Sequence, residues 1–306
     1  MARNLHLGPG AFQGIQMVSR IEVHIVSHFR EDRTTQLHIV LDAMLGWKNC
    51  IVAATITSNV DTYETSGFLR PYIDQFERRG HNLTLNVASG LANPRMLTWE
   101  HKKFVNTWLE SASPGEDFFI YIEDDIALTH ENITYFIRNI QTLKSKKLIP
   151  GFIRYEKKDN EIRLVDVMNT EYWQRDRSIS IGSQIYHSNL NPYWAGFILD
   201  RDLAKEYTES RSFSPIDSEF VPWNIQERSA MGLTYEDPTP RLRSRMVIPI
   251  IQGRPDPDCL VWHCSNSYSA DNHPVVATLT VDAAYRTETL VEHLGRKAKR
   301  LLAKRA

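Results

Sequence analysis

Apolar, β-branched segments alternate with segments of helical periodicity over the first half of this 306-residue chain. The apolar segments predict strands, and the segments between them, with apolar residues every three or four positions, predict helices. The expected strands span residues 21–26, 49–57, 82–87 and 118–122, and the expected helices span residues 34–45, 68–79, 96–111 and 132–147. Strands and helices that alternate at this spacing form a parallel sheet with crossover helices. The sequence therefore predicts an α/β fold whose mostly parallel sheet is flanked by helices.

The second half of the chain is less regular. Residues 152–156 and 162–167 flank a turn and predict a hairpin, and the chain beyond about residue 200 is rich in prolines and loops. We expect a single domain over residues 1–290, made of one half at 20–130 and another at 131–290. Residues 291–306 carry six bases and one acid, and they predict a terminal helix. Such a helix either contacts an anionic membrane surface or is merely solvated.

Composition and charge exclude several classes of protein. The formal net charge of −1 argues against a general nucleic-acid binder. Three cysteines without a CxxC pair argue against a disulfide framework and a structural zinc site. The N-terminus lacks the apolar run of a signal peptide, and no apolar stretch is long enough to span a membrane. We therefore expect a cytoplasmic protein, with peripheral contact at the inner face of a membrane as the only membrane association.

The most informative segment is the apolar strand 118–122, which runs directly into Glu123, Asp124 and Asp125. Ligands of open α/β sheets bind beyond the carboxyl ends of the strands. Three adjacent acids repel one another, so a positive partner should compensate them. Mn²⁺ and Mg²⁺ favour carboxylate oxygens and bridge to phosphates, which makes either cation the expected cofactor. A solvated acidic turn is the alternative.

This segment resembles the acidic DxD motif of nucleotide-sugar glycosyltransferases of the GT-A fold, in a Glu-Asp-Asp form. The resemblance covers the order of elements over roughly residues 20–270. It implies that Asp125 is the foremost metal ligand. It also implies that Glu123 and Asp124 bind the nucleotide ribose or metal-bound water, with Glu123 as a second metal ligand.

A second block, residues 191–204, resembles the β-1,3-galactosyltransferases and Fringe-like enzymes. In those enzymes this block forms the floor of the donor-sugar pocket. The small side chains of Ala195 and Gly196 would let a sugar approach the backbone, and Tyr193 or Trp194 would offer it an aromatic face. The resemblance thus implies that Trp194 and Gly196 bind the donor. This chain has Trp-Ala-Gly where the family often has Cys-Ser-Gly, and a core strand with a glycine bulge is the alternative.

Candidate catalytic acids and a late histidine follow. An inverting transferase needs one ionised carboxylate near the acceptor hydroxyl. Glu227 lies where the resemblance places that base, and Asp217 and Glu219 are rivals. In many GT-A enzymes a histidine near the C-terminus is also a metal ligand, and the resemblance implies that His263, or His273 in its place, has this role.

The expected nucleotide-binding residues are less sharply marked. Ser27 and Arg30 follow the first strand, and Ser58 follows the second, where this fold would hold the base. Arg95 or Lys102 could pair with the diphosphate. The chain has no P-loop and no GxGxxG after the first strand, so ATPase and redox functions lose their main support.

Together these features predict a metal-dependent glycosyltransferase that moves a sugar from a nucleoside diphosphate donor, most simply a UDP-sugar, to a glycan, glycolipid or other hydroxyl acceptor. Inversion is expected if Glu227 is the base, and retention if no carboxylate reaches the acceptor. Two alternatives stay open: a Mg²⁺-dependent sugar nucleotidyltransferase, and an inactive GT-A-like binding or scaffold protein. The sequence alone does not name the sugar or the acceptor.

Overall fold

The computed structural model describes residues 20–111, 117–159, 161–165, 173–189, 191–240, 242–268 and 279–282. The expected basic helix at 291–306 and the rival ligand His273 lie outside these residues. No helix in the described part of the chain combines the length and the apolarity that crossing a membrane requires.

The central element is a five-stranded sheet in the order β11-β4-β1-β2-β3. Neighbouring strands among β4, β1, β2 and β3 pair in parallel, whereas β11 is antiparallel to β4. The strands are β1 (Arg20–Ser27), β2 (Val52–Ser58), β3 (Asn82–Val87), β4 (Asp117–Glu123) and β11 (Gly196–Leu199). All four strands expected in the first half of the chain are therefore present, and the predicted α/β class is confirmed.

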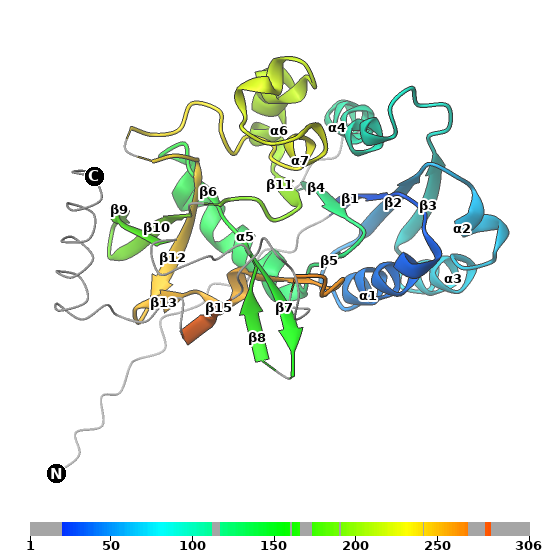
Figure 1. Cartoon of the computed structure of the whole chain (residues 1–306), viewed down its shortest axis with the longest axis horizontal. Coiled ribbons are helices and arrows are strands. Elements are labelled where there is room, and N and C mark those ends of the chain that lie inside the picture. The colour runs from blue at the N-terminus through cyan, green and yellow to red at the C-terminus, as the bar shows by residue number, and fades with distance from the viewer. Residues whose placement is uncertain are drawn as a thin grey trace, which may run out of the picture.

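Helices cover both faces of this sheet, with α1 and α3 on one side and α4, α6 and α7 on the other (Figure 1). The helices are α1 (Thr34–Leu45), α2 (Thr62–Thr65), α3 (Arg70–Arg78), α4 (His101–Glu110), α5 (His130–Lys144), α6 (Arg201–Glu209) and α7 (Ile225–Ser229). Short 3₁₀ turns are η1 (Glu31–Arg33), η2 (Pro94–Trp99), η4 (Arg211–Phe213), η5 (Asp217–Phe220) and η6 (Pro257–Cys259). The helix expected over 96–111 is thus divided, because Pro94 and the Asn93 cap begin a 3₁₀ turn before α4.

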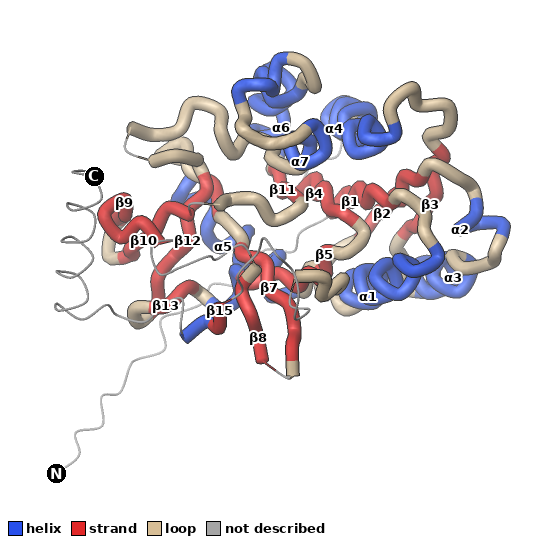
Figure 2. The backbone as a smooth tube through the Cα atoms, in the orientation of Figure 1, coloured by secondary structure: helices blue, strands red, loops and turns tan. Residues whose placement is uncertain are grey.

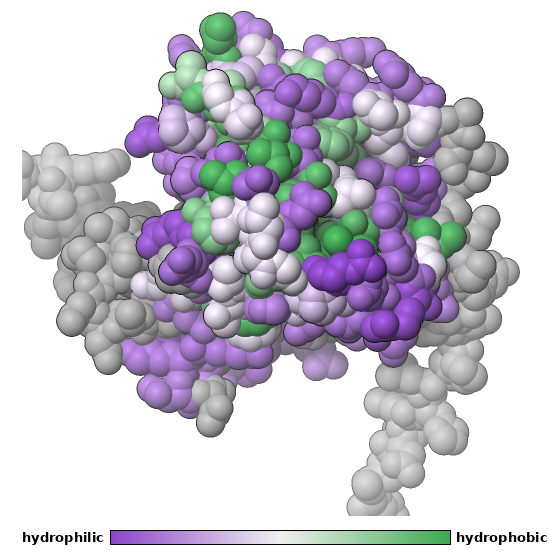
Figure 3. Space-filling view, turned by 90° about the vertical axis from the view of Figure 1, so that its right-hand side faces the viewer, coloured by the Kyte–Doolittle hydropathy of each residue, from purple (hydrophilic) through white to green (hydrophobic). Residues whose placement is uncertain are grey.

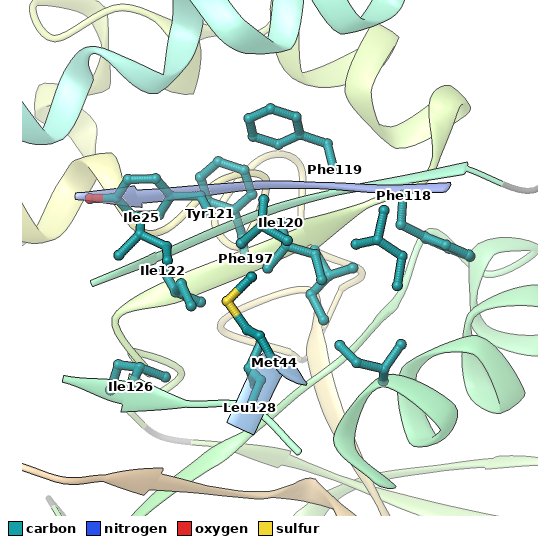
Figure 4. Packing of buried hydrophobic residues seen from close by; sticks show 14 of the residues in the cluster. Ile25, Met44, Phe118, Phe119, Ile120, Tyr121, Ile122, Ile126, Leu128 and Phe197 are labelled. Atoms are coloured by element: carbon teal, nitrogen blue, oxygen red, sulfur yellow. The ribbon is translucent and has the colours of Figure 1, made fainter. Parts of the chain in front are cut away.

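Side chains of β4 alternate between the two helical layers, which explains why this strand is apolar throughout. Phe119 packs against Trp108 of α4, with ring centroids 5.9 Å apart. Phe118 points the other way and meets Phe136 of α5, also at 5.9 Å. Figure 4 shows this packing, with Met44 of α1 on the side of the strand opposite Phe119. A strand covered on both faces needs an unbroken apolar run, as the sequence has.

Two further sheets complete the fold (Figure 2). One contains β6 (Ile149–Pro150), β9 (Trp173–Ile181), β10 (Gln184–Asn189), β12 (Met246–Ile251) and β13 (Arg254–Pro255). The other contains β5 (Ile126–Ala127), β7 (Ile153–Lys158), β8 (Glu161–Leu164), β14 (Leu260–His263) and β15 (Leu279–Thr280). The hairpin predicted near residues 152–167 is the pair β7–β8.

The sheet that contains β5 positions the functional residues. β5 follows the three carboxylates directly, and β14 pairs with it so that His263 lies opposite Ile126. The Cys264 N–H also donates to the Asp125 carbonyl over 2.8 Å. Two segments nearly 140 residues apart in the chain are therefore joined at the end of β4.

Val87, at the end of β3, is an exposed apolar residue. Seen from that side, hydrophobic residues gather near the middle of the face and hydrophilic residues flank them (Figure 3).

Candidate functional site

The strand order places a topological switch point between β1 and β4. From β1 the chain continues to β2 and β3 on one side, and it returns to form β4 on the other side. Connections that diverge in this way leave a crevice beyond the carboxyl ends of the two strands, where ligands of α/β proteins bind. Ser27 ends β1 and Glu123 ends β4, with Val26 and Glu123 in register. We call Glu123, Asp124 and Asp125 the acidic triplet.

Asp124 joins the two strand ends. The Ser27 hydroxyl donates to Asp124 Oδ2 over 2.6 Å and accepts from the Tyr63 hydroxyl over 2.6 Å. Arg33 Nη1 lies 3.3 Å from Asp124 Oδ1. Burial and the neighbouring Asp125 charge nevertheless raise the pKa of Asp124 to about 7. Arg33 was not singled out from the sequence, although it lies in the same loop as Arg30.

Asp125 forms a chain of contacts with a histidine and a second carboxylate. His263 Nε2 lies 3.2 Å from Asp125 Oδ2, and His263 Nδ1 lies 2.7 Å from Glu156 Oε1. Burial would lower the pKa of His263, but these two hydrogen bonds raise it above its usual value. The pKa of Asp125 is lowered, because the His263 contact outweighs the effect of burial. Its second oxygen, Oδ1, is buried and has no hydrogen-bond partner among the described residues.

Glu156 is the residue of this chain of contacts that the sequence analysis missed. Its side chain is fully buried, and both its oxygens accept from the Tyr268 N–H over 3.1 Å. Arg154 and Glu156 alternate with apolar residues on β7, a pattern that marks one polar face of a strand. That pattern alone does not reveal that β7 packs beside β14 and His263.

Glu123 connects the acidic triplet to two aromatic rings. The Tyr193 hydroxyl donates to Glu123 Oε1 over 2.8 Å, and the Tyr193 ring stacks on Trp223 with centroids 5.6 Å apart. The Arg154 guanidinium lies 4.7 Å from the centre of the Tyr193 ring. Burial, followed by the Asp125 charge, raises the pKa of Glu123 to about 7.

Trp194 and Gly196 lie in the core and not at an open surface. The Trp194 side chain is buried against Phe152, with ring centroids 4.7 Å apart. A Cβ on Gly196 would stand 2.6 Å from the Tyr121 carbonyl oxygen, so the glycine is required by the close approach of β11 to β4. This burial fits the core strand given above as the alternative, and a role of Trp194 and Gly196 at the floor of a sugar pocket stays a prediction. The adjacent Tyr193 is the side chain that reaches the carboxylates.

Two cavities lie near this edge of the sheet, and Glu123 and Asp124 line one of them. The strand-end cavity is lined by Val26, His28, Arg33, Pro94, Leu97, Thr98, Glu123, Asp124 and Gln226. The α7 cavity is open, has a volume of about 600 Å³, and is lined by Glu219, Val221, Pro222, Trp223, Asn224, Ile225, Glu227 and Arg228. Residues of α7 line both cavities, so this helix forms the wall between them.

The candidate bases occupy different places. Glu227 lines the α7 cavity, but its Oε2 accepts from the Asn224 N–H over 3.2 Å in a capping box at the start of α7. Glu219 lines the same cavity. Asp217 lines neither cavity as described, and its charge acts on Lys102. Burial lowers the pKa of Lys102 to about 8, against the opposing effect of Asp217.

The expected nucleotide residues are spread along the same edge of the sheet. Ser58 is buried at the end of β2, opposite Ser27 in the parallel register. Arg30 and Arg95 are exposed, and neither is among the residues that line the strand-end cavity. Lys102 Nζ lies 4.8 Å from the centre of the Trp99 ring and 5.2 Å from that of the Phe213 ring.

Within the described ranges, no group of three or more His, Cys, Asp and Glu side chains converges on a metal position. The donor types at the acidic triplet nevertheless suit Mn²⁺ or Mg²⁺. Cis ligands of an octahedral ion at about 2.1 Å are about 3 Å apart, which is close to the 3.2 Å between Asp125 Oδ2 and His263 Nε2. The second bond of His263, to Glu156, is the kind that orients metal-bound histidines.

No protein-family model and no curated relative matches the sequence. Among solved structures, the chain is similar to the apo form of the glycosyltransferase GlyE of Streptococcus pneumoniae TIGR4, with a TM-score of 0.37, 8% identity, and coverage of 74% of this chain and 45% of that one. It is similar to the mannosyltransferase PcManGT of Pyrobaculum calidifontis in complex with GDP-Man and Mn²⁺ (0.39, 10%, 80% and 56%). It is also similar to a glycosyltransferase involved in glycosylation of the major capsid of PBCV-1 (0.31, 13%, 74% and 79%).

The chain spans about half the length of the first two of these structures. All three TM-scores lie below 0.5, and we therefore base the function on the residues of the site itself.

Proposed function

We propose that this chain is a glycosyltransferase that moves a sugar from a nucleoside diphosphate donor to a glycan or another hydroxyl acceptor, with the help of Mn²⁺ or Mg²⁺. The observation that carries the proposal is the acidic triplet at the switch point of the central sheet, where Asp124 and Asp125 are buried and Glu123 and Asp124 line the strand-end cavity. One cavity would hold the nucleotide of the donor and the other the acceptor, with the triplet between them.

The strand-end cavity, with a volume of about 70 Å³, has room for only part of a nucleotide, and its lining suits the diphosphate. Arg33 and His28 bring basic side chains to it, and Thr98 brings a hydroxyl. A guanidinium binds phosphate oxygens through charge-assisted hydrogen bonds. Arg33 therefore takes the role for which Arg95 and Lys102 were considered, with a UDP-sugar as the first donor to test.

Asp125 and His263 would hold the cation, and Glu123 would be the next oxygen ligand. Among the described residues the buried Oδ1 of Asp125 has no hydrogen-bond partner, and the pKa values of Glu123 and Asp124 are raised to about 7, so an added positive charge would stabilise this site. When bound, the cation would supply charge neutralisation for the diphosphate leaving group. Glu156 would keep the Nδ1 proton of His263 occupied and leave Nε2 as the ligand atom.

The transfer step needs a base on the acceptor side. In an inverting reaction the acceptor oxygen bonds to the anomeric carbon, and the bond from that carbon to the diphosphate oxygen breaks with its electron pair. The acceptor proton passes to a carboxylate. Glu227 and Glu219 line the α7 cavity, whereas Asp217 does not. We propose Glu227, which must leave its capping box to act, and the rates of Glu227→Gln and Glu219→Gln would decide between the two carboxylates.

Donor binding tests the proposal most directly. Unfolding temperatures would be compared for a panel of nucleoside diphosphates, nucleoside triphosphates and nucleotide sugars, each with Mn²⁺ and with EDTA. A ligand at 100 times its dissociation constant stabilises a protein by about 2.7 kcal/mol. We expect one nucleotide to give a metal-dependent shift that Asp125→Asn abolishes.

The matched control is Asp202→Asn, which changes an exposed carboxylate paired with Lys144, and it should keep the shift. Absence of a shift with every nucleotide would overturn the proposal. A shift with a nucleoside triphosphate alone would favour the nucleotidyltransferase instead.

A further inference from the structure

The α7 cavity is joined to the acidic triplet by a short relay of side chains. Trp223 lines the cavity and stacks on Tyr193, whose hydroxyl donates to Glu123. Gln226, on the next turn, lines the strand-end cavity together with Asp124. A group bound against Trp223 is therefore separated from Glu123 by one side chain, that of Tyr193.

Trp223 is the aromatic side chain that this cavity presents. The Tyr193 ring already contacts the Arg154 guanidinium and Trp223, and the Trp194 ring is buried. The Trp223 indole is half-buried, and its Nε1–H donates to the Tyr235 hydroxyl over 3.2 Å, which fixes the orientation of the ring. A fixed, partly exposed indole is a suitable surface for the C–H face of a sugar ring.

The polar groups of the cavity select against negative charge. Glu219 and Glu227 contribute two carboxylates, Arg228 contributes one guanidinium, and Asn224 is uncharged. Carboxylates accept hydrogen bonds from sugar hydroxyls, but they repel uronic acids, sulfates and phosphates. The volume of about 600 Å³ falls within the range of small-molecule sites and leaves room for more than one sugar ring.

We propose that the α7 cavity is the acceptor subsite for an uncharged glycan, with Trp223 as the stacking platform and specificity-determining residue. This inference rests on the proposed glycosyltransferase function. It adds the chemical class of the acceptor and a residue that neither motif in the sequence marked.

Saturation-transfer NMR would test it on the full chain. The neutral probes are maltose, cellobiose, lactose and diacetylchitobiose, and the anionic probe is a hyaluronan disaccharide, which carries a glucuronic acid. We expect at least one neutral disaccharide to receive saturation and the anionic one to receive none. Trp223→Ala should weaken the neutral ligand about tenfold, whereas Trp223→Phe should retain most of the affinity.

Phe220→Ala serves as the matched control, because Phe220 is exposed on the neighbouring segment but does not line the cavity. Its affinity for the disaccharide should equal that of wild type. Unfolding temperature and nucleotide binding would be measured on every variant, so that a general loss of structure is recognised.

The outcomes separate this inference from the proposed function. Nucleotide binding by wild type without binding of any neutral disaccharide, unchanged affinity in Trp223→Ala, or equal binding of the anionic disaccharide would each overturn the inference and leave the donor site standing. Absence of both nucleotide and sugar binding would overturn the proposed function as well. Loss of the disaccharide in Trp223→Ala, with nucleotide binding intact, would support both.

Discussion

Polar side chains are buried both in the middle of the central sheet and at its carboxyl edge. Those in the middle are uncharged, whereas those at the edge include adjacent carboxylates. In the middle, His24 Nε2 lies 2.8 Å from Thr57 Oγ1, and His101 bonds to the Thr98 carbonyl and the Tyr207 hydroxyl. Burial lowers the pKa of both histidines, that of His101 to about 3, so both are neutral. These groups are held by hydrogen bonds between uncharged partners.

At the carboxyl edge β4 ends in adjacent like charges. Glu123 and Asp124 have pKa values near 7, and His263 is held between two carboxylates. Neutral hydrogen bonds in the middle of the sheet stabilise the fold, whereas adjacent buried acids destabilise it unless a positive group binds. We infer from this difference that the carboxyl edge binds a positively charged ligand. The predictions below test this inference, from the largest expected effect to the smallest.

The largest effect is expected for Glu156→Gln. A glutamine amide accepts the hydrogen bond from His263 Nδ1–H less strongly than a carboxylate does. The imidazole of His263 is then no longer held in the tautomer that leaves Nε2 free to bind a metal. Loss of such a partner typically weakens metal affinity by about 10- to 100-fold. Titration of Mn²⁺ by electron paramagnetic resonance would measure the change without any assay of activity.

Glu22→Gln makes the same chemical change on another strand, β1, where Glu22 pairs with Arg20, and should leave the Mn²⁺ affinity unchanged. Equal affinity of wild type and Glu156→Gln for Mn²⁺ would show that Glu156 only fills space beside His263.

A smaller effect, on stability, is expected for Glu123→Gln. Because the folded pKa of Glu123 is about 7 against an ordinary 4.5, the carboxyl favours the folded state below pH 4.5, and this benefit is lost as the pH rises through 7. At pH 8 in EDTA the neutral amide should therefore raise the free energy of unfolding by about 1–3 kcal/mol. Urea unfolding at pH 8 and pH 5 would measure it.

The pH 5 experiment is the control, since a protonated Glu123 and a glutamine should give nearly equal stability there. A variant that is less stable than wild type at pH 8 would mean that the Tyr193 and Arg154 contacts outweigh the burial of the charge.

The first half of the fold could be predicted from the sequence because its signals are local. The run 118–122 is apolar throughout since β4 is covered on both faces, and Ser27 and Asp124 meet because parallel strands end at one edge. The ends of the elements shifted by a few residues where local turns intervened, as with the 3₁₀ turn before α4.

The rest of the site depends on contacts between distant segments. Glu156 reaches His263 only because β7 pairs with β14. The sequence also could not show which of Tyr193 and Trp194 reaches the carboxylates. Ala195 has a φ of 60°, so the side chains there do not alternate as in a regular strand. Arg33 is one of several bases near the end of β1, and nothing in its immediate neighbours distinguishes it.

The smallest effect concerns the middle of the sheet. The folded pKa of His24 is lowered below 6.5, so the unfolded chain binds the proton more readily and stability falls as the pH drops below 6.5, by up to about 1.4 kcal/mol for each unit. His24→Phe removes this term, and its ring would lie beside Phe104, whose centroid is 4.7 Å from that of His24. It loses the Thr57 bond but also removes the buried, unpartnered Nδ1, while Thr57 still accepts from Asn86. Relative to wild type, the variant should gain about 1 kcal/mol between pH 7.5 and pH 5.5 in urea unfolding. Parallel stability curves for the two proteins would mean that His24 is not held neutral, and the contrast between the middle of the sheet and its edge would fail.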